Sequence, residues 1–205
     1  MLNRSGFDLW ADSYDRSVGL SDENGTYPFA GYRDILDTIY RRILSSGAKS
    51  VLDVGFGTAV LAARLYAQGC RIYGQDFSAR MIALACEKMP DASLYQGDFT
   101  HGLVSELAAQ QYDAIVATYS LHHLPDAQKV SLLTTLTARL SSGGCIYIGD
   151  VAFQTRARLE QCRIQAGDEW DSDEIYFVYD ELNAQLPGLT FTPLSPCAGL
   201  LTLNA

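Results

Sequence analysis

The stretch that most constrains this chain is Val51-Leu52-Asp53-Val54-Gly55-Phe56-Gly57-Thr58-Ala59. An apolar run typical of a buried strand contains the carboxylate of Asp53, and a Gly-x-Gly turn begins two residues later. Because Gly55 and Gly57 lack a Cβ atom, the backbone can turn tightly there and approach a ligand at the carboxyl end of the strand. The stretch therefore predicts a strand, a turn and a helix, with a ligand site at the turn.

The charge of Asp53 restricts the kind of ligand. A dinucleotide would place its pyrophosphate beside this turn, where a carboxylate would repel it. S-adenosylmethionine instead presents an ammonium and a sulfonium group, and Asp53 would attract both. The spacing agrees, because the dinucleotide fingerprint G-x-G-x-x-G needs a glycine at position 60 and this chain has Val60.

The chain from Lys49 onward alternates short apolar runs with helical patterns, which is typical of βαβ units and a parallel sheet. Strands are predicted over residues 50–54, 70–75, 93–96, 112–118 and 145–150, and helices over 58–68, 79–88, 102–109 and 126–140. Two last β-like runs, 189–194 and 198–203, are too close together for a crossover helix, so they must pair antiparallel. The expected fold is α/β and doubly wound, with a mostly parallel sheet of seven strands and a C-terminal antiparallel hairpin.

The first 48 residues are rich in aromatic side chains and carry two helical patterns. The first pattern consists of Phe7, Trp10, Ala11 and Tyr14, and the second of Tyr32, Ile35, Leu36, Ile39 and Ile43. The first helix either packs on the core or forms a lid over the ligand. We therefore expect one domain, in which residues 1–48 are a helical lid or cap on the main body, residues 49–205.

The overall charge argues against a nucleic-acid partner. The chain carries 15 Lys and Arg against 24 Asp and Glu, a formal net charge of −9, whereas binding to a phosphate backbone depends on clustered cations. A small-molecule substrate is favoured instead. No apolar run reaches the ~18 residues of a membrane span, and no apolar signal segment begins the chain, so we expect a cytoplasmic protein.

The cysteines do not indicate a further functional site. Five cysteines are scattered without a C-x-x-C pair, so neither a disulfide framework nor a metal site is expected. The sequence does not indicate an oligomeric state.

Acids and aromatic residues follow the second and third predicted strands. Asp76 ends the second strand about 20 residues after Gly55, where a carboxylate can accept hydrogen bonds from ribose hydroxyls of S-adenosylmethionine or NAD alike. Asp98 either accepts a hydrogen bond from an adenine amino group or is an ordinary turn carboxylate. Phe77 and Phe99 follow these acids and either flank the adenine ring or pack in the core.

The fourth predicted strand leads into Thr118-Tyr119-Ser120-Leu121-His122-His123-Leu124, at the strand end that should face the reacting centre. His122 could accept a proton from an attacking hydroxyl or nitrogen, although a histidine here can also cap the next helix. The aromatic faces of Tyr14 and Tyr119 could stabilise a sulfonium by cation–π contact.

With Ala59 in place of its last glycine, the stretch from Asp53 resembles motif I, acid-x-G-x-G-x-G, of the class I S-adenosylmethionine-dependent methyltransferases. The segments 7–15, 31–36 and 118–124 look most like the YrrT-like bacterial methyltransferases, and the resemblance covers nearly the whole chain. It implies cofactor contacts at Gly55, Asp76 and Asp98, with Tyr14 near the methionine end. It implies no acceptor, and the acid-or-Asn-Pro-Pro-aromatic run of enzymes that methylate nucleobase or amide nitrogens is absent.

The expected function is methyl transfer by in-line displacement at the sulfonium to a small-molecule acceptor, with no metal required. One alternative is a module that binds S-adenosylmethionine without turning it over. The other, an NAD(P)-dependent oxidoreductase, is disfavoured by Asp53, Val60 and the hairpin. The acidic segment 168–174 is either a solvated linker or a specificity element near the acceptor.

Overall fold

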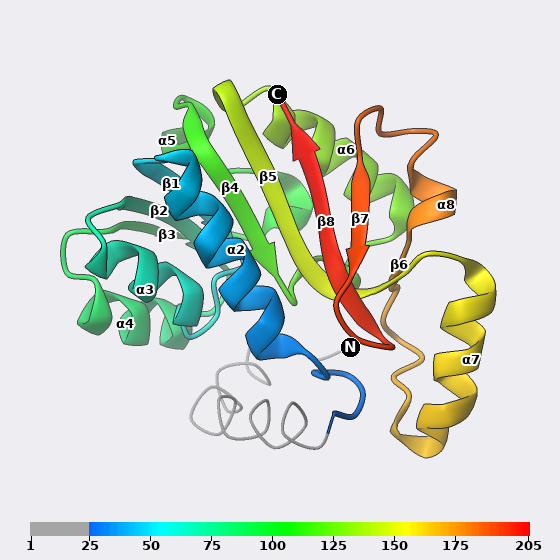
Figure 1. The fold of residues 1–205 in the computed structure, drawn as a ribbon. Helices are drawn as coiled ribbons and strands as arrows, with labels where there is room; N and C mark the ends of the chain where they lie inside the picture. The colour runs from blue at the N-terminus through cyan, green and yellow to red at the C-terminus, as the bar shows by residue number, and fades with distance from the viewer. Residues whose placement is uncertain (1–24) are drawn as a thin grey trace.

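The structure of the protein is a computed structural model that describes residues 25–205. The first predicted helix, with Trp10 and Tyr14, lies outside the described residues. Figure 1 shows a central sheet with helices on both of its faces. The sheet has eight strands, seven of them in the order β3-β2-β1-β4-β5-β8-β7, while β6 pairs with β5 beside this path.

The strands are β1 (Ser50–Val54), β2 (Arg71–Asp76), β3 (Ser93–Gln96), β4 (Tyr112–Thr118), β5 (Leu140–Phe153), β6 (Phe177–Val178), β7 (Thr190–Pro193) and β8 (Ala198–Asn204). The α-helices are α2 (Tyr32–Ser46), α3 (Val60–Ala67), α4 (Ala79–Lys88), α5 (Ser105–Ala108), α6 (Asp126–Thr137), α7 (Arg156–Ala166) and α8 (Tyr179–Leu182). Three short 3₁₀ helices complete the described chain: η1 (Phe99–His101), η2 (Leu121–His123) and η3 (Gly167–Glu169).

The pairing of the strands confirms the predicted doubly wound architecture. Strands β1 to β5 pair in parallel, whereas β8 runs antiparallel to both β5 and β7. The predicted C-terminal hairpin is therefore confirmed. The two-residue strand β6, parallel to β5, was not expected, because a run this short carries no periodicity.

The strands bury side chains on both faces of the sheet. In β4, Ala114 and Val116 belong to one apolar cluster, while Ile115 and Ala117 belong to the other. Helices α2, α3 and α4 pack on the first face, and α5 and α6 contribute to the cluster on the second face. No helix within residues 25–205 combines the length and the apolar surface that crossing a bilayer requires.

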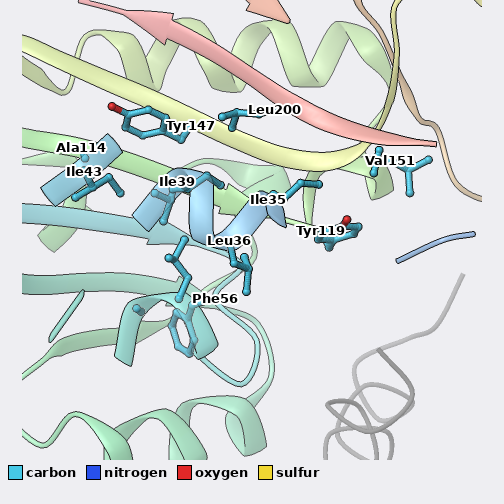
Figure 2. Close-up of a cluster of buried hydrophobic side chains, with 14 of the residues drawn as sticks. Ile35, Leu36, Ile39, Ile43, Phe56, Ala114, Tyr119, Tyr147, Val151 and Leu200 are labelled. Carbon is cyan, nitrogen blue, oxygen red and sulfur yellow. The ribbon is translucent and has the colours of Figure 1, made fainter. Parts of the chain in front are cut away.

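Helix α2 follows the predicted pattern, with four of its apolar residues buried: Ile35, Leu36, Ile39 and Ile43. Figure 2 shows these side chains between the helix and the sheet, with Leu36 on the side of Phe56. The helix lies close to β5 because Gly149 has no side chain. A Cβ atom at Gly149 would overlap the Cγ2 atom of Ile35 and lie 3.3 Å from Cδ1 of Ile39.

The boundary between α6 and β5 differs from the prediction. The helix ends at Thr137, and β5 begins at Leu140, although a helix was expected as far as residue 140. Leu140 pairs with Tyr112, and the hydroxyl of Ser141 donates hydrogen bonds to the carbonyl oxygen of Tyr112 and to the Asp113 carboxylate. The serine- and glycine-rich segment thus starts a strand with an irregular register.

The order of the strands also locates the site. Beside β1, the chain proceeds to β2 and β3 on one side of the sheet and to β4 and β5 on the other. Doubly wound sheets bind their ligands outside the carboxyl ends of the strands at such a switch point. The ligand site is therefore expected at the carboxyl ends of β1 and β4.

Substitution of Gly149 by alanine should lower the free energy of unfolding by about 1–3 kcal/mol, because the added methyl group overpacks the contact between β5 and α2. Urea denaturation measures this loss. The variant Ile35→Ala removes the atom that the new methyl group would meet. The double variant should therefore lose less stability than the sum of the two single losses, and strict additivity would contradict the proposed contact.

Candidate active site

A cavity of about 580 Å³ lies at the carboxyl ends of β1, β2 and β4. Two groups of its lining residues could bind a ligand or take part in a reaction. The first, called the glycine turn here, consists of Asp53, Gly55 and Gly57 together with Asp76 from the end of β2. The second, the histidine cluster, consists of His122, His123 and Glu174. The cavity thus joins the predicted ligand turn to the end of the fourth strand.

Asp53 is a buried carboxylate in an unusual state. The residue is 1% exposed, and its Oδ1 atom has no hydrogen-bond partner among the described residues. Burial, together with the nearby charge of Asp76, raises the pKa of Asp53 to about 8. A cation bound beside it would favour the ionised form, so this carboxylate is suited to a positively charged ligand.

The conformation of the turn depends on Gly55 and on Asp76. A Cβ atom at Gly55, where φ is 72°, would lie 2.6 Å from Cβ of Ser120. The backbone N–H groups of Gly57 and Ser78 each donate a 2.9 Å hydrogen bond to the Asp76 carboxylate. Asp76 therefore fixes the turn and still borders the cavity.

Ala59 explains why the resembled motif usually carries glycine at its last position. The residue has a φ of 60° and precedes α3 in the left-handed conformation, which glycine adopts without steric cost. The chain tolerates alanine here at some cost in strain. The turn therefore keeps the backbone path of the motif.

Three of the four predicted aromatic residues border the cavity, namely Phe77, Phe99 and Tyr119, whereas Tyr14 lies outside the described residues. Tyr119 has a φ of 49°, and its ring lies 5.2 Å from the ring of Phe29 and 5.3 Å from that of Tyr32. Residues 25–32 therefore contribute aromatic surface next to the glycine turn.

Asp98 does not line the cavity within the described part of the chain. Its carboxylate caps η1 by accepting a 2.8 Å hydrogen bond from the backbone N–H of Thr100, and its other oxygen lies 3.5 Å from Nδ1 of His101. These contacts are those of a turn carboxylate, and the adenine contact stays a prediction.

His122 lies between two carboxylates. Its Nδ1 atom donates to Oδ1 of Asp150 at 2.6 Å, and its Nε2 atom lies 3.4 Å from Oε1 of Glu174. Burial lowers the pKa of His122, but Asp150 and Glu174 outweigh burial, so that the pKa is raised. Burial and the neighbouring His122 lower the pKa of His123 to about 4.

The acidic segment 168–174 lies along the wall of the cavity. Four of its carboxylates border the cavity: Glu169, Asp171, Asp173 and Glu174. Most of these residues are exposed, whereas Glu174 is half-buried. This position on the cavity wall suits the predicted specificity element. The role itself stays a prediction.

Two anchors hold the end of this segment against the fourth strand. The backbone N–H of Ile175 donates a 2.8 Å hydrogen bond to the carbonyl oxygen of His122. The Nζ atom of Lys129, a residue with no exposed surface, donates to the carbonyl oxygen of Ile175 and lies 2.9 Å from the Asp126 carboxylate. Lys129 thereby connects α6 to the cavity wall.

Aromatic contacts join the same segment to the residues before α2. The ring of Tyr27 stacks on Trp170 at 5.0 Å, and its hydroxyl is hydrogen-bonded to that of Tyr176. Tyr176 also donates a 2.7 Å hydrogen bond to Oε2 of Glu174. The carboxylate of Glu174 is thus oriented from one side by Tyr176 and faces His122 on the other.

Sequence reasoning missed several of these residues. Asp150 lies at the end of the predicted fifth strand, so the rule that ligand groups follow strand ends could have found it. Lys129 interrupts the apolar face formed by Leu132, Leu133 and Leu136, which was a detectable signal of a buried, paired cation. The proximity of Glu174 to His122 had no local signal, because it depends on the path of the chain after α7.

Comparisons with known proteins identify the family of this chain. A family model described as a methyltransferase domain matches residues 51–144. An uncharacterized methyltransferase of Anoxybacillus flavithermus is 32% identical over 200 residues, covering 92% of this chain and 91% of the relative. Another, from Geobacillus thermodenitrificans, is 37% identical over 156 residues, covering 76% of this chain and 69% of the relative.

Solved structures are similar over most of the chain. The complex described as DhpI-SAM-HEP has a TM-score of 0.69 and 21% identity, covering 97% of this chain and 94% of that one. The N-methyltransferase NodS from Bradyrhizobium japonicum, solved with S-adenosyl-L-homocysteine, has a TM-score of 0.62 and 19% identity, covering 84% of this chain and 86% of that one. At these identities the likeness shows the fold. The two relatives, at 32% and 37% identity, go further, and together with the family match they show that this chain belongs to the methyltransferase family.

Proposed function

We propose that the protein transfers a methyl group from S-adenosylmethionine to a small-molecule acceptor. The observation that carries this proposal is a single cavity bordered by both the glycine turn and the histidine cluster. Such an arrangement provides for a cationic donor beside Asp53 and for a second molecule beside His122. The complex described as DhpI-SAM-HEP and the complex of NodS with S-adenosyl-L-homocysteine support the choice of donor.

The residues of the glycine turn fit this donor. The buried Oδ1 atom of Asp53, which has no hydrogen-bond partner among residues 25–205, is placed to attract the ammonium and sulfonium groups. Gly55 lets the turn pack against Ser120, where a Cβ atom would not fit, and Asp76 is placed to accept hydrogen bonds from the ribose hydroxyls. Phe77 and Phe99 offer apolar surface for the adenine ring.

The chemistry asks little of the protein beyond alignment. S-adenosylmethionine, when bound, supplies a methyl group that its sulfonium already activates. The chain contributes orientation, which can be worth roughly 7–11 kcal/mol, and exclusion of water from the reacting atoms. The ring of Tyr119 adds a cation–π contact of about 0.5–2 kcal/mol to the sulfonium.

The acceptor side favours a small molecule over nucleic acid. Four carboxylates of the acidic segment border the cavity, and phosphate backbones would be repelled there. Glu174 belongs to this wall, and His122 lies next to it, where an acceptor would contact both. This second set of polar groups favours an enzyme over a module that only binds the donor.

Titration calorimetry of the full chain with S-adenosylmethionine, S-adenosylhomocysteine and NAD tests the proposal. Above pH 8, where Asp53 is ionised, the first two should bind and NAD should not, because its pyrophosphate would meet the negative charge of Asp53. Release of S-adenosylhomocysteine in the presence of small-molecule acceptors should then identify the substrate. Binding of NAD alone would overturn the proposal, and donor binding without turnover on any acceptor would favour the binding module.

The variant Asp76→Ala should weaken binding of S-adenosylhomocysteine by about 1.5–3 kcal/mol, the scale of hydrogen bonds to a charged group. Calorimetry measures this loss directly. Asp91→Ala is a matched control, because Asp91 is an exposed carboxylate whose partner is the Tyr66 hydroxyl. Equal affinities of the two variants would remove Asp76 from the ribose role.

The raised pKa of Asp53 predicts a pH-dependent affinity. Below its pKa of about 8 the free protein holds a proton on this carboxylate, and a bound ammonium group favours its release. The affinity for S-adenosylhomocysteine should therefore rise by up to about tenfold per pH unit between pH 6 and 8, and then level off.

Calorimetry in buffers of different ionisation enthalpy should detect this proton release at pH 7. The variant Asp53→Asn cannot titrate, so its affinity should be weaker and its release of protons smaller. If the variant released as many protons as the unsubstituted protein, Asp53 would not be the group that ionises.

A further inference from the structure

The histidine cluster contains a set of donor atoms that could do more than border the acceptor. His122 and His123 of η2 and Glu174 of the acidic segment each direct one nitrogen or oxygen atom to a common region, and these three atoms lie within 4.8 Å of one another. All three residues border the cavity. Two imidazoles and one carboxylate are also the donor set of zinc sites that keep a fourth position open.

The separation of the donors suits a metal ion. Two donors that each lie about 2.1 Å from a tetrahedral zinc ion are about 3.4 Å apart. The Nε2 atom of His122 and Oε1 of Glu174 are 3.4 Å apart in this structure. The widest pair of the three needs at most about 1.4 Å of approach, which rotation of side chains can supply.

The second nitrogen of His122 has the partner that metal-binding histidines usually have. Its Nδ1 atom donates to the fully buried Asp150 carboxylate, which also accepts a 2.8 Å hydrogen bond from the backbone N–H of Val151. This arrangement leaves the Nε2 atom, which a proton or a metal ion can occupy, directed toward Glu174. Carboxylate–histidine–metal sites are built in the same way, because the carboxylate fixes the ring and raises its basicity.

Glu174 is held in place for the same purpose. Tyr176 donates to its Oε2 atom, and the anchored backbone of Ile175 keeps the residue beside His122. The Nε2 atom of His122 and Oε1 of Glu174 face each other at 3.4 Å, so a cation between them, either a proton on the imidazole or a metal ion in its place, is attracted by both groups. Lys129 does not supply this charge, because it is engaged with Asp126 and the carbonyl oxygen of Ile175.

We propose that His122, His123 and Glu174 bind a divalent transition-metal ion, with Asp150 as the positioning residue of His122. Two imidazole donors favour zinc or a similar ion over magnesium or calcium, which prefer oxygen donors. Positions left open on the ion face the cavity, where an oxygen or nitrogen atom of the acceptor can occupy them. Metal binding stands by itself, whereas its use in holding an acceptor rests on the proposed function.

Titration of the chelator-treated full chain with Zn²⁺ alone tests the site. One equivalent should bind, and Co²⁺ in its place should give the visible absorption of a nitrogen- and oxygen-ligated ion. The variants His123→Gln and Glu174→Gln should each lower the affinity for Zn²⁺ by more than about tenfold. Asp150→Asn should lower it by roughly 10- to 100-fold, although Asp150 would not touch the metal.

His101→Gln is the matched control, because His101 is exposed and lies outside the cluster. Its affinity for Zn²⁺ should equal that of the unsubstituted chain. No stoichiometric binding to the unsubstituted chain, or an equal loss in His101→Gln, would overturn the metal site whatever the variants do to folding.

Parallel titration with S-adenosylhomocysteine keeps the two proposals distinguishable. A chain that binds S-adenosylhomocysteine but no Zn²⁺ would overturn the metal site and leave the proposed function in place. A chain that binds one Zn²⁺ through the cluster but neither form of the donor would support the metal site and overturn the proposed function.

Discussion

Two buried carboxylates at the neighbouring ends of β1 and β2 set the chemistry on which the rest of the site depends. Asp76 is satisfied by backbone N–H groups that it holds in the turn, whereas Oδ1 of Asp53 has no hydrogen-bond partner among residues 25–205. A buried carboxylate is costly unless a cation or a proton compensates it. The sheet therefore builds a place for positive charge at its switch point, which is what the proposed donor brings.

The same physical problem recurs at the end of β4. Asp150 and Glu174 bring two carboxylates to either side of His122, and the anchoring of Ile175 by His122 and Lys129 keeps the second one there. A cation again resolves the arrangement, whether a proton or, as we propose, a metal ion. One cavity thus contains two separately built sites for positive charge, one for the donor and one toward the acceptor.

Much of the fold could be predicted because its signals are local. The bounds of β1, β3, β4 and α4 agree with the prediction, since each is a short run closed by turn residues. Gly55, Gly57 and Asp76 could be placed from spacing alone. Glu174 and Lys129 could not, because a loop after α7 and a buried face of α6 bring them to the cavity. Asp98 shows that a position at the end of a strand does not by itself identify a ligand contact, because its carboxylate caps η1.

The contact between Tyr27 and the acidic segment bears on how fast ligands can exchange. Two chain segments separated by 149 residues meet there through one hydroxyl pair, one hydrogen bond from the backbone N–H of Asp171 and packed rings, while the strands beneath are joined by ladders of backbone hydrogen bonds. Separating the segments costs far less than disrupting the sheet, and such openings occur well below the free energy of global unfolding. The rate at which ligands enter and leave the cavity should therefore depend on how often this aromatic contact opens, and not on the stability of the domain.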